Sequence, residues 1–170
     1  MRGILHAIDD ATGEDIWSFK TPGSILHTCA VEGNNIYFGN AEGRVYAVDI
    51  DNGKLAWFVH TGAAIWNSPL VCRGIVLIGS RDGKIYAIDA ESSGIKWTKQ
   101  TGGPLLSSPA VDAKAARVYI GCEEICVYSF ELADGRQVWR SEKFPGVNFR
   151  RYHPVIAPDG LVVITVTPAL

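Results

Sequence analysis

The sequence AVDIDNGKLAW, residues 47–57, decides the fold because recognisable copies of it recur along the chain. The other copies are AIDDATGEDIW at residues 7–17, AIDAESSGIKW at 87–97 and the more divergent SFELADGRQVW at 129–139. Each copy ends in tryptophan, and these residues are 40, 40 and 42 positions apart: Trp17, Trp57, Trp97 and Trp139. A fixed period of this length indicates a repeat architecture, in which each repeat is one structural unit.

Each repeat contains short runs of β-branched and aromatic residues bounded by turn residues, as in NIYFG at 35–39 and IVLIG at 75–79. Three-residue hairpin loops end in Gly43 and Gly83, as expected where the last loop residue takes a positive φ. Ile125 replaces this glycine in a later copy, so a different loop shape is expected there. Helical periodicity is absent, and each repeat is predicted to form four antiparallel strands.

Four antiparallel strands in about 40 residues are typical of a β-propeller blade. The chain opens with a third and a fourth strand, residues 3–19, and closes with a first and a second strand, residues 152–167. The prediction is an all-β propeller with three complete blades and two half-blades. It forms one domain, residues 1–170, with repeats at about 3–42, 43–82, 83–124 and 125–167. Three completions stay open: a fragment of a larger propeller, a four-blade ring closed by pairing of the two ends, or two chains forming eight blades.

The composition excludes some partners. Of the 170 residues 47% are hydrophobic and 20% charged, and the net charge is −2, which describes a soluble globular protein. Without a basic excess, neither nucleic acid nor an anionic membrane is an expected partner. No apolar run approaches the ~20 residues that span a bilayer. No signal peptide is expected in residues 1–10, because Asp9 and Asp10 follow Arg2 without the apolar region that such a peptide requires.

The spacing Ala-x-Asp-x3-Gly-x3-Trp resembles the tryptophan-docking motif of pyrroloquinoline-quinone (PQQ) type propeller repeats. Two copies keep the whole pattern: Ala7, Asp9, Gly13 and Trp17, then Ala47, Asp49, Gly53 and Trp57. In the third copy Ser93 stands in the glycine position and Gly94 follows it, while the fourth copy has Ser129 and Glu131 for Ala and Asp. The resemblance implies a ring of seven or eight blades. A structural role at the seams between blades is expected for Trp17, Trp57, Trp97 and Trp139.

The resembling family includes quinoprotein dehydrogenases, which oxidise alcohols or sugars with PQQ and calcium, and non-catalytic scaffolds such as the propeller lipoprotein of the outer-membrane β-barrel assembly machinery. The Cys-Cys and Cys-x-x-Cys-His motifs of the first kind are missing from this sequence. We therefore expect a non-enzymatic module without a cofactor, which binds a protein partner, a ligand or the remaining blades of a larger propeller. The alternatives are part of a PQQ- and calcium-dependent dehydrogenase, or a propeller attached to a kinase or adenylating enzyme. The resemblance favours the periplasm or cell envelope.

The repeats differ most at the start of the inner strand, where function is expected to have been added to the scaffold. The candidate residues at this channel mouth are His27, Trp66, Asn67, Arg150, Arg151, Tyr152 and His153. They either form a polar and aromatic pocket for a ligand or partner, or cap strands and coat a wet channel. Asp9, Asp49 and Asp89 recur too regularly for one catalytic or calcium site and are predicted to make turn hydrogen bonds. No catalytic, cofactor-binding or metal-ligating residue is assigned.

Cys122 and Cys126 lie opposite one another across a predicted hairpin. A cross-strand disulfide, two free thiols and a metal site stay open, and a disulfide would imply an oxidising compartment. Cys29 and Cys72 are expected to be small buried residues. His6 occupies a column that holds tyrosine in the other copies, so a packing role is expected for it.

Overall fold

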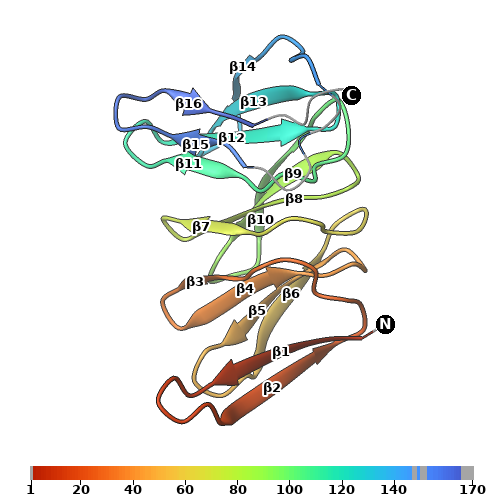
Figure 1. Cartoon of the computed structure of the whole chain (residues 1–170), viewed down its shortest axis with the longest axis vertical. Helices are drawn as coiled ribbons and strands as arrows, with labels where there is room; N and C mark the ends of the chain where they lie inside the picture. The colour runs from red at the N-terminus through yellow and green to blue at the C-terminus, as the bar shows by residue number, and fades with distance from the viewer. Residues whose placement is uncertain (1, 147–148, 150–152, 166–170) are drawn as a thin grey trace.

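The computed structural model describes residues 2–146, 149 and 153–165, in which all the regular secondary structure is β-strand (Figure 1). Its strands form three four-stranded and two two-stranded antiparallel sheets, which confirms the prediction of three complete blades and two half-blades. Among the described residues there is no helix of the length and apolarity needed to cross a membrane.

The strands follow the order of the sequence within each sheet. The N-terminal half-sheet contains β1 (Gly3–Ile8) and β2 (Asp15–Thr21). The first complete sheet contains β3 (Ala30–Glu32), β4 (Asn35–Gly39), β5 (Arg44–Asp49) and β6 (Leu55–His60). The second contains β7 (Leu70–Cys72), β8 (Ile75–Gly79), β9 (Lys84–Asp89) and β10 (Ile95–Gln100). The third contains β11 (Ala110–Asp112), β12 (Arg117–Cys122), β13 (Cys126–Glu131) and β14 (Gln137–Arg140). The C-terminal half-sheet contains β15 (Val155–Ile156) and β16 (Val162–Val163).

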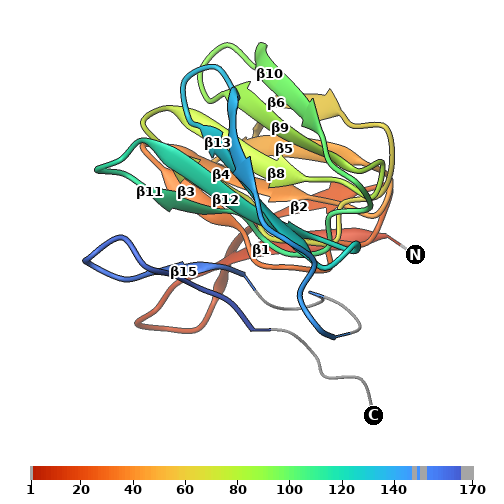
Figure 2. The same ribbon diagram turned by 90° about the horizontal axis from the view of Figure 1, so that it is seen from above.

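The two half-sheets lie at opposite ends of the molecule, with the three complete sheets between them (Figure 1). Seen from above, the complete sheets overlap one another, as blades do when each packs on the next (Figure 2). β1 and β16 belong to separate sheets. The pairing of the two ends that a closed four-blade ring requires is therefore not formed among the described strands.

The core lies in the seams between sheets, where the second and third strands of each sheet are covered on both faces. Every residue of β8, IVLIG, is buried, and Val45 and Val48 of β5 have no exposed area. A strand buried on both faces reads as a continuous apolar run, which explains why the sequence does not alternate there. The outer strands do alternate, as in β6, because only one of their faces packs against a neighbouring sheet.

The repeated tryptophans connect successive sheets through their indole N–H groups. Trp17 Nε1 donates to the Ile50 carbonyl at 2.9 Å, Trp57 Nε1 to Ala90 at 3.0 Å and Trp97 Nε1 to Leu132 at 3.0 Å. Each acceptor lies at the turn after the third strand of the next sheet. The fourth indole, Trp139, packs beside Tyr119, with ring centroids 5.7 Å apart.

Glycine lets these turns lie directly on the indole rings. A Cβ atom at Gly53 would be 2.6 Å from the ring of Trp17, and one at Gly135 would be 2.5 Å from the ring of Trp97. Both glycines have positive φ, at 67° and 68°, which also favours glycine. In the third copy Ser93 takes this conformation, with φ of 62°.

The aspartates of the repeat shape the same turns, as predicted. One carboxylate oxygen of Asp9 accepts hydrogen bonds from the backbone N–H groups of residues 11 and 12, and Asp49 and Asp89 accept the equivalent pairs. The Lys96 ammonium, 2.9 Å from Asp89, and these turn N–H groups hold the pKa of Asp89 far below its usual range. The carboxylates are thus engaged locally as turn acceptors.

The hairpin at residues 122–126 keeps the geometry of the glycine turns. Ile125 N donates to the Cys122 carbonyl at 2.9 Å, as Gly83 N does to Ser80 at 3.1 Å, and Ile125 has φ of 63°. The expectation of a different loop shape is therefore wrong. The Ile125 side chain is buried in a cluster with Phe149, and this apolar contact offsets the strain of a positive φ.

The packing role expected for His6 and the burial expected for Cys29 are wrong, and Cys72 is only half-buried. His6 is exposed, with Nδ1 3.0 Å from Asp15 Oδ1, because no sheet packs on the outer face of the N-terminal half-sheet. Cys29 is exposed because it directly precedes β3, which is the first strand of its sheet and lies at the sheet edge.

Candidate functional site

An exposed aromatic and cationic pair lies at the predicted channel mouth. The Trp66 side chain is 36% exposed, and the Arg81 guanidinium carbon lies 4.2 Å from its ring centroid. Trp66 belongs to the segment between β6 and β7, and Arg81 to the turn between β8 and β9. A guanidinium over an indole face is attracted by the electron-rich ring, so the pair is held together while staying accessible.

Asn67, predicted beside Trp66 at the mouth, instead connects two sheets. Its side chain is 2% exposed, and Nδ2 donates to the carbonyls of Gly79, at 2.9 Å, and Leu105, at 3.0 Å. The amide oxygen accepts from Gly79 N at 3.3 Å. The amide donor and acceptor of Asn67 are therefore both engaged inside the protein. Asn67 fixes the segment that carries Trp66, and its side chain has no polar group left to bind a ligand.

A short hydrogen-bond chain fastens the segment that carries Trp66. The Tyr86 hydroxyl donates to Asp82 Oδ2 at 2.5 Å and accepts from Gly62 N at 3.1 Å. Nearby, the Ser80 hydroxyl donates to the Ala63 carbonyl at 3.0 Å. Burial, together with the hydrogen bond to Asp82, raises the pKa of Tyr86 to about 12.

The raised pKa of Tyr86 predicts an alkaline weakening of this segment. Because the pKa in the folded protein lies above the ordinary value of 10.0, the contribution of Tyr86 to stability is complete below pH 10. It is lost as the pH rises from 10 through about 12. The denaturation midpoint of the wild type should therefore fall more steeply in this interval than that of Tyr86→Phe, which cannot ionise. Parallel midpoint curves for the two proteins would contradict the prediction.

A groove of about 430 Å³ runs along the start of the inner strands. It brings together Thr28, Ser68, Ser108 and His153, which come from four successive repeats. The Thr28 and Ser68 hydroxyls are 2.7 Å apart, and Ser68 N donates to the Ser108 hydroxyl at 2.9 Å. These hydroxyls therefore bridge neighbouring sheets.

The structure thus separates the predicted mouth residues. His153 lies at the groove, and His27 is exposed one residue before the groove residue Thr28. Trp66 is exposed and Asn67 is buried. Arg150, Arg151 and Tyr152 lie outside the described residues. Sequence reasoning missed Arg81, which pairs with Trp66 from a separate turn.

The described lining of the groove does not fit calcium. It offers hydroxyls and one imidazole among proline and aliphatic side chains, but no carboxylate. Calcium takes six to eight oxygen ligands, among which carboxylates are prominent. Nowhere in residues 2–146, 149 and 153–165 do three His, Cys, Asp or Glu side chains gather as a metal site would require. The described lining of this groove therefore lacks the carboxylates that a calcium site would use.

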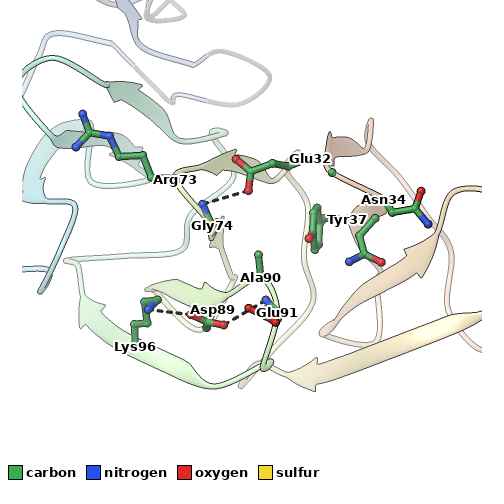
Figure 3. A pocket seen from close by; sticks show the side chains of 11 residues that line it. Glu32, Asn34, Tyr37, Arg73, Gly74, Asp89, Ala90, Glu91 and Lys96 are labelled. Atoms are coloured by element: carbon green, nitrogen blue, oxygen red, sulfur yellow. Dashed lines mark hydrogen bonds and ion pairs between the residues drawn. The ribbon is translucent and has the colours of Figure 1, made fainter.

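A second cavity, of about 360 Å³, lies between the first and second complete sheets (Figure 3). Four of its charged side chains are engaged within the protein: Glu32, Arg73, Asp89 and Lys96. Glu32 Oε2 accepts from Gly74 N at 3.1 Å, and Lys96 pairs with Asp89 (Figure 3). Arg73 Nη2 donates to the Ala113 carbonyl at 2.6 Å. The bonds of Glu32 and Arg73 join neighbouring sheets, whereas the Lys96–Asp89 pair lies within the second complete sheet.

Cys122 and Cys126 are direct partners in the β12–β13 ladder, and both are free thiols in the structure. Their side chains are 1% and 0% exposed, and burial raises the pKa of Cys122. The disulfide between them stays a prediction.

Because thiolate is the reactive form of cysteine, the burial of both thiols and the raised pKa of Cys122 predict slow reaction of this pair. Iodoacetamide should modify the exposed Cys29 in the native protein, and Cys122 and Cys126 only after unfolding. Peptide mass mapping distinguishes the sites. If the pair resists iodoacetamide even after unfolding and reacts only once reductant is added, a disulfide is present and the expectation fails.

The comparisons with known proteins agree on the fold. A family model described as outer membrane protein assembly factor BamB matches residues 1–165. The crystal structure of BamB from Moraxella catarrhalis aligns with a TM-score of 0.61 and 20% identity, over 96% of this chain and 71% of that one. Quinohemoprotein alcohol dehydrogenase from Comamonas testosteroni aligns with a TM-score of 0.75 and 20% identity, over 95% of this chain and 36% of that one. The computationally designed Ika8 protein aligns with a TM-score of 0.78 and 15% identity, over 92% of this chain and 50% of that one.

At these identities the similar structures show the fold alone. No curated protein matches the sequence. The chain spans 36% of the length of the dehydrogenase, so the activity of that enzyme is not transferred by the likeness.

Proposed function

The chain belongs to the family described as outer membrane protein assembly factor BamB, and on that premise we propose that it is a non-enzymatic scaffold that binds a protein partner. The contact surface is the mouth, defined by Trp66 and Arg81. The name of the family assigns its members to protein assembly at the outer membrane, which favours an envelope protein as the partner.

The observation that carries this proposal is the exposed Trp66 ring under the Arg81 guanidinium. Tryptophan and arginine are the residues most enriched where truncation weakens protein interfaces most. The backbone beneath the pair is fixed by Asn67 and by the Tyr86 hydrogen bonds, so little conformational entropy is lost when a partner binds. The pair is thus suited to anchor a partner.

The test is to compare which envelope proteins are retained by the immobilised wild-type chain and by the double variant Trp66→Ala, Arg81→Ala. A partner purified from the first experiment should bind the double variant about 30-fold or more weakly, since an interface anchor contributes about 2 kcal/mol or more. Phe58→Ala is the matched control, because Phe58 is 44% exposed on the outer strand β6 and also has an arginine beside it, with the Arg44 guanidinium carbon 5.5 Å from its ring centroid. Equal binding by all three proteins would contradict a role for the mouth.

The competing function, a PQQ-dependent dehydrogenase, has its own readout. The chain is mixed with PQQ and Ca²⁺, its absorption spectrum is recorded, and dye-linked oxidation of an alcohol and of glucose is measured. Neither a quinone complex nor turnover is expected from a scaffold. Quinone binding accompanied by turnover would overturn the proposal.

A further inference from the structure

The two half-sheets are complementary parts of one blade. In each complete sheet the strands are hydrogen-bonded in sequence order, as in β3-β4-β5-β6. By their place in the repeat, β1 and β2 correspond to the third and fourth strands, and β15 and β16 to the first and second. Each half-sheet therefore provides the strands that the other lacks.

On the N-terminal half-sheet, a residue that is buried in complete sheets is exposed. Ile8 of β1 is 62% exposed, whereas the equivalent residues Val48 and Ile88 have no exposed area. Those two residues lie on third strands, which pair with a second strand on one side and a fourth strand on the other. β1 pairs only with β2, so one of its edges is unpaired among the described strands.

The C-terminal half-sheet shows the same exposure on its second strand. Val163 of β16 is 48% exposed, whereas the equivalent residues Leu77 and Tyr37 are 0% and 2% exposed. An unpaired strand edge beside exposed apolar side chains favours pairing with another strand.

The two half-sheets cannot satisfy one another within this structure, because they lie at opposite ends of the molecule (Figure 1). This chain covers 50% of the designed Ika8 protein, which shares the fold, so two copies of the chain together correspond to its length. We propose that two copies of this chain associate in a closed ring, in which β16 of each copy pairs antiparallel with β1 of the other. Both unpaired edges disappear, and the ring closes by two-fold symmetry.

The complete sheets fix the register of this pairing. In the second complete sheet Val76 lies opposite Ile88, and Leu77 opposite Ala87. Transferred to the half-sheets by the repeat, these pairs place Val162 of one copy opposite Ile8 of the other, and Val163 opposite Ala7. The exposed Ile8 then lies where its equivalents are fully buried.

The first test is the mass of the 170-residue chain in solution, measured by light scattering over a range of concentrations. We expect twice the monomer mass of 18.5 kDa. Ile8→Lys should be monomeric, because it places an ammonium in the desolvated seam of the ring. Ile16→Lys is the matched control: Ile16 is 60% exposed on β2 of the same half-sheet, and its equivalents Ala56 and Lys96 are exposed in complete sheets too.

A dimeric wild type with a monomeric Ile8→Lys and a dimeric Ile16→Lys supports the ring. A monomeric wild type at every concentration overturns it, as does the same mass for both lysine variants. Circular dichroism establishes that each variant is folded, since Ile8 and Ile16 are already exposed in the single chain.

The second test examines the register. The double variant Ala7→Cys, Val163→Cys should form disulfides between copies under mild oxidation, which peptide mass mapping assigns to these two positions. Ile16→Cys combined with Val163→Cys should not cross-link. Cross-linking of the second pair without the first would overturn the proposed pairing.

Discussion

Trp97→Ala should lower the free energy of unfolding by about 3–5 kcal/mol, the usual cost of truncating a large buried aromatic residue. Trp97 is 7% exposed and belongs to the core cluster shared by the second and third complete sheets. Its indole also donates to the Leu132 carbonyl of the next sheet at 3.0 Å. The substitution therefore leaves a cavity in the seam and an unpaired carbonyl beside it. Whole domains are stable by only about 5–15 kcal/mol, so this single change should approach the limit of stability.

Urea unfolding, followed by circular dichroism, measures this loss as a shift of the midpoint. Trp66→Ala is the control for removing an indole, because Trp66 is exposed at the mouth. This substitution should lower the free energy of unfolding by only about 0.5–1 kcal/mol, because it removes the contact with Arg81 at an exposed site. Similar midpoints for the two variants would show that the seam does not depend on Trp97.

Gly135→Ala tests the same seam from the opposite side. The new Cβ would lie 2.5 Å from the Trp97 ring, and the backbone there has φ of 68°. The left-handed conformation costs about 1–2 kcal/mol in any residue other than glycine. Overpacking against the ring adds about 1–3 kcal/mol. We expect a total loss of about 2–5 kcal/mol.

Gly13→Ala separates these two costs. Gly13 has the same place in the first repeat and φ of 75°, but no atom lies within 4 Å of a Cβ built there. It should show only the conformational cost of about 1–2 kcal/mol. In a Trp97→Ala background, Gly135→Ala should fall to the same value, because the ring that it strikes has been removed. If Gly135→Ala costs no more than Gly13→Ala in the wild type, close approach to the indole is not the reason for glycine.

The repeat itself predicted most of the fold. Equivalent positions about 40 residues apart predicted the strands, the half-sheets and the aspartate turns. They did so because equivalent residues have the same surroundings in successive sheets. The same logic failed where a copy lacks a neighbour. His6 stands in a tyrosine column but is exposed, since no described sheet covers the outer face of β1.

The candidate site was only partly predictable. Asn67 and Trp66 are adjacent in a divergent segment, yet one is buried between sheets and the other is exposed. Arg81 gave no signal in the sequence, because its contact with Trp66 depends on how two separate turns meet in space. Such contacts follow from the packing of neighbouring sheets and not from the spacing of residues.

The indole hydrogen bonds also have a direction along the chain. Each runs from a tryptophan to a carbonyl 33 or 35 residues nearer the C-terminus, never to one made earlier. During synthesis at about 5–20 residues per second, each tryptophan therefore waits roughly 2–7 seconds for its acceptor to be made. The sheet made most recently in a nascent chain therefore lacks its indole hydrogen bond to the next sheet. That sheet is the part of the chain that a chaperone or a protease would bind.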